Sequence, residues 1–204
     1  MTDDSQLVAQ TFHEMRRFCS DIALLLKTGE EVFRRHGWTT AQPDKTSVYS
    51  QSYSLDRPRG WLPLRFFRYY SHPEFSSTLA YLAVVINLPV GRENEDGTTY
   101  LTAGAFDYGR SQGWGKGPTS KDTKLFQWHL VRKDAAYDGV PTWHKTPFEW
   151  SEANQPDKWQ QVITGIQSAV TLGLPLHEVT DAGQLESQVI KPLLAEIANR
   201  SSVH

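Results

Sequence analysis

The residues with the clearest chemical potential lie in a glycine-rich and basic segment, 109–121. Glycine lets backbone N–H groups approach an anion closely, and lysine adds positive charge, so this segment suggests an anion or nucleotide sensor. A Walker loop, however, has Ser or Thr after its lysine, where this chain has Gly117, and it opens a helix rather than a strand. A hairpin loop is the plainer interpretation. The side chains here that a ligand or partner would meet are Arg110, Trp114, Lys116 and Lys121.

A second chemical possibility is an acid and a base that the fold brings together, as in a small hydrolase or nuclease. Asp107 ends a predicted strand, 98–108, whose small residues 103–105 leave room for another group to approach closely. A flanking helix is the ordinary occupant of such a strand face, and a pocket is the alternative. In the pocket interpretation, Asp107 and His129 are the catalytic candidates, and the rim residues are Asp107, His129, Arg65 and Tyr69.

Other reactive chemistries lack the residues that they require. The chain has one cysteine, Cys19, which excludes a disulfide or a multi-cysteine cluster within one chain. Cys19 also falls on the apolar stripe of a predicted helix, where a thiol usually serves packing. The seven histidines show no recognised metal-ligand spacing, and no Gly-x-Ser-x-Gly motif of serine hydrolases occurs. We therefore expect neither a cofactor nor a metal ion.

The segment 61–70 interleaves arginines with aromatic residues, and bulky side chains fall on both faces of the strand predicted there. One face would then meet helices, and the other a partner, a ligand or a second subunit. The chain is basic overall from 57 to 133 and acidic from 149 to 204, so its charge could steer an anionic ligand or a protein partner. Packing of a basic sheet against acidic helices would explain the same pattern. The candidate contacts in this segment are Arg65, Arg68 and Tyr69.

Helical periodicity appears near both ends of the chain. Apolar residues in alternating steps of four and three predict a helix over 5–27: Val8, Phe12, Met15, Cys19, Ile22 and Leu26. Thr28 and Glu31 have the spacing of a capping box and Gly37 that of a terminator, which predicts a second helix over 29–36. Similar periods predict helices over 156–173 and 181–199, with Pro192 kinking or restarting the last one.

Alternating and apolar runs between these helices predict a sheet. The links between the first runs are short and turn-like, which favours an antiparallel meander, because parallel neighbours need long crossovers. The run 78–88 is apolar on both faces and is therefore placed centrally. The predicted fold is α+β, with roughly five strands at 47–55, 62–71, 78–88, 98–108 and 124–133.

Composition bounds the class of protein. With 204 residues, 39% hydrophobic and 22% charged, the chain can bury enough apolar surface to fold, and we expect a single α+β domain over 1–204. Residues 1–4 and 200–204 are expected to fray. A net charge of −2 gives no general attraction to nucleic acid or membranes, and neither a signal sequence nor a spanning apolar stretch is evident. A cytoplasmic protein without a membrane partner is the expectation.

These observations favour a non-enzymatic binding or regulatory protein. It would act through the aromatic and basic sheet surface or through its helices, on a protein partner or by self-association as a homodimer. Two alternatives stay open: a small hydrolase or nuclease that uses Asp107 and His129, and an anion or nucleotide sensor that uses the segment 109–121. Nucleic acid and other anions are the less favoured partners, because the net charge does not select them.

Overall fold

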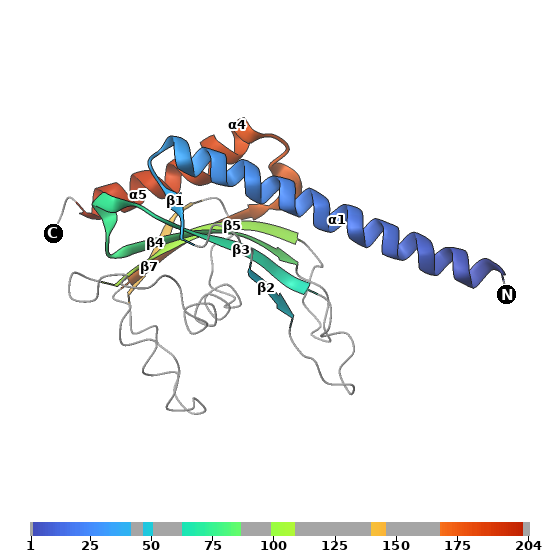
Figure 1. The fold of residues 1–204 in the computed structure, drawn as a ribbon. Coiled ribbons are helices and arrows are strands. Elements are labelled where there is room, and N and C mark those ends of the chain that lie inside the picture. Colours follow the sequence, from blue (N-terminus) through green and yellow to red (C-terminus); the bar gives the residue numbers. More distant parts are fainter. Residues whose placement is uncertain are drawn as a thin grey trace, which may run out of the picture.

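A long amino-terminal helix and a carboxyl-terminal helical segment lie on one face of an antiparallel sheet (Figure 1). The computed structural model describes residues 2–41, 47–50, 63–86, 99–108, 140–145 and 168–201. Every strand pair in these ranges is antiparallel. The predicted α+β class and its antiparallel sheet are confirmed.

Helix α1 (Thr2–Arg35) is continuous through the point where a break was expected between the helices 5–27 and 29–36. The capping box predicted at Thr28 is wrong, because the Thr28 hydroxyl donates a hydrogen bond to the Leu24 carbonyl, at 2.9 Å, within the same helix. A side chain bonded one turn back does not cap a new helix. One helix of 34 residues therefore replaces the two expected ones.

The end of α1 lies where the glycine signal predicted it. Gly37 has a φ of 83°, a left-handed conformation that glycine adopts without a steric penalty. The N–H groups of Trp38 and Gly37 donate to the carbonyls of Phe33 and Arg34, each at 3.0 Å. This pair of bonds is the Schellman motif, and it turns the chain from the helix toward the sheet.

Three consecutive strands form the meander at the centre of the sheet. They are β3 (Pro63–Ser71), β4 (Thr78–Ile86) and β5 (Thr99–Asp107), and the short helix η2 (Pro73–Phe75) links the first two. β4 is buried along almost its whole length, as expected of a strand that is apolar on both faces. The described parts of three predicted strands are thus confirmed: 62–71, 78–88 and 98–108.

The two edges of the sheet are built differently. On one side, β1 (Thr39–Thr40) and β2 (Ser47–Ser50) both pair with β3, and β2 confirms the first part of the strand predicted at 47–55. On the other side, β6 (Thr142–Lys145) pairs with β7, which itself pairs with β5. The strand predicted at 124–133 lies outside the described residues.

Strand β7 (Ser168–Pro175) corrects the helix predicted over 156–173. Residues 168–173 form a strand that pairs residue by residue with β5, and residues 156–167 lie outside the described part. Val170 fits a helical stripe, but residues 168–173 form a strand that is buried on both faces. Periodicity alone does not separate a buried strand from a buried helix over so few residues.

The carboxyl-terminal helical segment confirms the helix predicted over 181–199. It comprises α4 (Ala182–Gln184), the π-helical segment η4 (Leu185–Ile190) and α5 (Lys191–Ser201). Proline lacks an N–H group, and its ring clashes with the carbonyl four residues back in an α-helix. The wider π-helical turn directly before Pro192 relieves that clash, and the chain continues as α5 without leaving the helix axis (Figure 1).

The main core lies between the sheet and the helices. Aromatic stacking closes one side of it, where the rings of Phe33 on α1 and Tyr70 on β3 are 4.0 Å apart and nearly parallel. Burial raises the pKa of Tyr70. The helix-facing residues alternate along the strands, and those of β4, β5 and β7 are Ala80, Leu82, Val84, Leu101, Ala103, Ala105, Val170 and Leu172.

Helix α1 comes closest to the sheet at Gly29. A Cβ atom at this position would lie 2.2 Å from the Cδ2 atom of Leu82 on β4. Leu82 is fully buried, so its side chain has little space into which to move. Glycine in the middle of a helix costs about 1 kcal/mol relative to alanine, and here it permits a contact that no larger residue would allow.

The opposite face of the sheet has its own close approach, at Gly104 on β5. The ring of Tyr81 on β4 occupies the space that a side chain at Gly104 would take, and its hydroxyl lies 3.3 Å from the Thr171 hydroxyl on β7. Both hydroxyl-bearing residues are fully buried. A hydrogen bond therefore links two strands across the glycine of a third.

We expect Gly104→Ala to reduce the free energy of unfolding by about 3 kcal/mol or more, because its Cβ would lie 2.3 Å from the backbone oxygen of Val170. Backbone cannot move aside as a side-chain end can. Urea unfolding followed by circular dichroism measures the loss. Gly183→Ala is the matched control, since Gly183 is exposed on α4 and should change stability by less than about 1 kcal/mol. Equal effects of the two substitutions would contradict this account of the sheet.

Candidate functional site

The sheet residues predicted to contact a ligand or partner are buried and divided between two faces. Arg65 and Tyr69 lie on the face opposite the helices, with exposed fractions of 8% and 3%. Arg68 lies on the helix face, where its guanidinium Nη2 is 3.2 Å from the Glu30 carboxylate of α1. The aromatic and basic segment of β3 therefore offers little surface to a partner on either side.

Strand alternation also separates the residues expected at the rim of a pocket. Asp107 shares the helix-facing side of β5 with Ala105 and pairs with Thr78 and Ser168 of the neighbouring strands. Arg65 and Tyr69 belong to the opposite face. The structure thus does not bring Asp107 and these two residues together.

The remaining predicted site residues lie outside the described part of the chain. The acid and base pair of Asp107 and His129, and the sensor segment 109–121, stay predictions. The residues concerned are His129, Arg110, Trp114, Lys116 and Lys121.

The space expected around residues 103–105 is filled by the protein itself. Ala103 and Ala105 lie beneath the helices in the main core, which confirms the interpretation of a flanking helix. On the other face, the ring of Tyr81 covers Gly104. The small residues of β5 therefore serve packing on both sides of the sheet.

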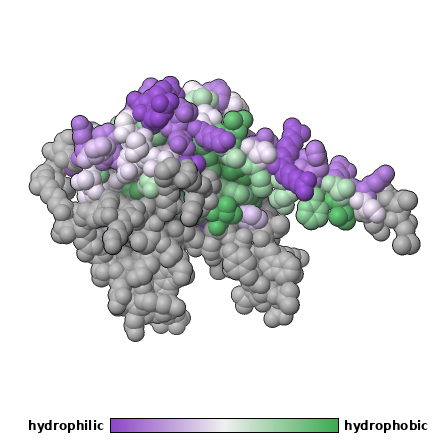
Figure 2. All heavy atoms as spheres, viewed as in Figure 1, coloured by the Kyte–Doolittle hydropathy of each residue, from purple (hydrophilic) through white to green (hydrophobic). Residues whose placement is uncertain are grey.

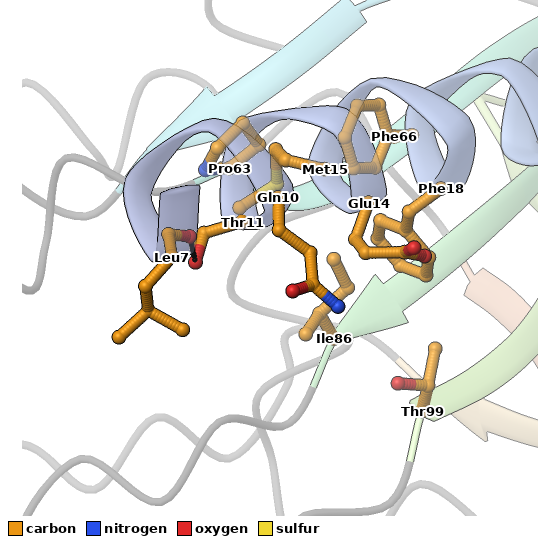
Figure 3. Close-up of a pocket in the computed structure, with 10 residues that line it drawn as sticks. All are labelled: Leu7, Gln10, Thr11, Glu14, Met15, Phe18, Pro63, Phe66, Ile86 and Thr99. Atoms are coloured by element: carbon orange, nitrogen blue, oxygen red, sulfur yellow. Dashed lines mark hydrogen bonds between the residues drawn. The ribbon is translucent and has the colours of Figure 1, made fainter. Parts of the chain in front are cut away.

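A groove lies between the amino-terminal half of α1 and the end of the sheet (Figure 3). Its volume is about 600 Å³, within the usual range of ligand pockets. Figure 3 shows the side chains of α1 that line it, together with residues of β3, β4 and β5. The lining is mainly apolar, with polar groups from Gln10, Thr11, Glu14 and Thr99; its apolar residues are Leu7, Met15, Phe18, Pro63, Phe66 and Ile86.

Beside this groove, α1 extends past the sheet into solvent (Figure 1). Residues 5–17, which we call the arm, are all exposed. Three large apolar side chains of the arm are more than half exposed: Leu7 at 64%, Val8 at 55% and Phe12 at 64%. Hydrophobic residues gather along the lower side of the projecting helix in Figure 2. Such a patch is unusual on a helix surface that faces only water.

The apolar stripe of α1 runs without interruption from this exposed part into the core. Val8 and Phe12 are exposed, whereas Ile22 and Leu26 on the same stripe are almost completely buried. The sequence predicted the stripe correctly but did not indicate which part of it is exposed. The missed signal was its length, because the stripe is longer than the sheet beneath it (Figure 1).

Ionic contacts fix the inner end of α1 to the carboxyl-terminal helical segment. The Glu186 carboxylate lies 2.9 Å from Nη2 of Arg35, 3.2 Å from Nε2 of His36 and 3.2 Å from Nζ of Lys191. The hydrogen bond from Lys191, together with His36 and Arg35, lowers the pKa of Glu186 against the opposing effect of desolvation. These contacts hold the base of the helix that carries the arm.

The described ranges contain neither a metal-binding cluster nor a membrane-spanning helix. No three His, Cys, Asp or Glu side chains there are grouped closely enough to hold a metal ion. No helix of the described part is long and apolar enough to cross a membrane. The groove and the arm are therefore the features of this part of the chain that call for a functional explanation.

Comparison with protein-family models, curated proteins and solved structures finds no match to this chain.

We expect Glu186→Gln to lower stability near neutral pH. Because the pKa of Glu186 is lowered in the folded protein, its ionised form stabilises the fold above the unfolded-state pKa of about 4.3. This contribution is lost as the pH falls through the lower folded-state pKa. The gap in unfolding free energy between wild type and variant should thus be larger at pH 7 than at pH 3 in urea titrations.

The control for this experiment is Glu31→Gln. Glu31 pairs with Arg34 on the exposed surface of the same helix, where ion pairs contribute little. It should show almost no gap at either pH. A Glu186→Gln gap that does not change with pH would show that the charge of Glu186 is not what stabilises the junction.

Proposed function

We propose that this chain is a non-enzymatic binding protein and that its partner docks on the arm of α1 and in the groove beside it. The observation that carries the proposal is the exposure of Val8 and Phe12 on a stripe whose other half is core, with the exposed Leu7 beside them. Of the two surfaces considered from the sequence, the helices are better supported than the sheet. Arg65 and Tyr69 on the sheet are almost fully buried.

The energetics favour a partner that covers both features. Burying a Leu, Val or Phe side chain completely is worth about 1.5–3 kcal/mol, so the exposed parts of the three arm residues could contribute about 3–5 kcal/mol. Association costs roughly 4 kcal/mol or more in lost translational and rotational freedom. The arm alone is therefore a weak site. A partner that also fills the groove of about 600 Å³ gains the additional apolar contact that binding requires.

The polar groups of the groove restrict the orientation and the chemistry of a partner that binds there. Gln10, Thr11 and Glu14 follow one another along a single side of α1 at the groove, as Figure 3 shows for their side chains. An apolar centre with a few polar groups at its rim is the usual composition of a protein interface. Glu14 adds a negative charge, which favours a partner with a basic group near its apolar contacts.

Photocrosslinking in cells that express the chain tests this proposal. A benzoylphenylalanine at position 12 should form covalent adducts with a bound protein, identified from its peptides by mass spectrometry. The same group at position 17 should not, because Arg17 is also exposed but lies off the apolar stripe. Adding Met15→Glu should reduce the adducts at position 12 at least about tenfold, since it places a charge within the apolar contact.

Two results would overturn the proposal. One is the absence of any adduct at position 12, and the other is the same adducts at positions 12 and 17. The far-ultraviolet circular dichroism of each variant shows whether α1 is intact, and exposed substitutions on the arm are expected to leave it unchanged.

A further inference from the structure

We draw no further inference here: the strongest candidate, the exposed apolar stripe of the arm at Val8 and Phe12 together with the groove beside it, belongs to the site already described, and nothing in the described part of the chain shows what covers it.

Discussion

The close contact between Gly29 on α1 and Leu82 on β4 determines how the rest of the described structure is arranged. With no side chain at position 29, the helix backbone can approach the sheet until the Leu82 methyl group takes the space of a Cβ atom. Leu26 and Phe33 on either side are then buried, and Phe33 stacks on Tyr70. Because α1 is one straight helix, the position at which it packs on the sheet also determines how much of it extends beyond the sheet edge (Figure 1).

The sequence was sufficient for the elements whose signals are local. The Gly37 terminator, the meander of β3, β4 and β5, and the helical region around Pro192 follow from turn chemistry and hydrophobic pattern. The wrong predictions arose where a local sequence pattern was compatible with two structures. Thr28 has the spacing of a helix cap, yet its hydroxyl can equally bond within a helix, and only the packing of Gly29 against the sheet decides between them.

Strand β7 shows the same limit at the level of the fold. The short run around Val170 fits a buried helix or a buried strand, and pairing with β5 decides the outcome. That pairing joins segments far apart in the chain, which no local pattern encodes. The exposure of the arm could not be predicted from the sequence for a related reason. The stripe of α1 has one repeat throughout, so only the position of the sheet shows that Phe12 is exposed and Leu26 is not.

The hydrogen bond between Tyr81 and Thr171, across Gly104, has a consequence for how the chain folds. Strand β7 must join β5 from a distant part of the sequence, and a slip of one residue would turn each of its side chains to the other face. Thr171 would then face the apolar helix layer, and the buried phenol of Tyr81 would lose this partner at a cost of about 1–3 kcal/mol. These three residues therefore help to set the register of β7. The strand pairs correctly with β5 only when the Thr171 hydroxyl reaches the Tyr81 hydroxyl over Gly104, the one position of β5 without a side chain.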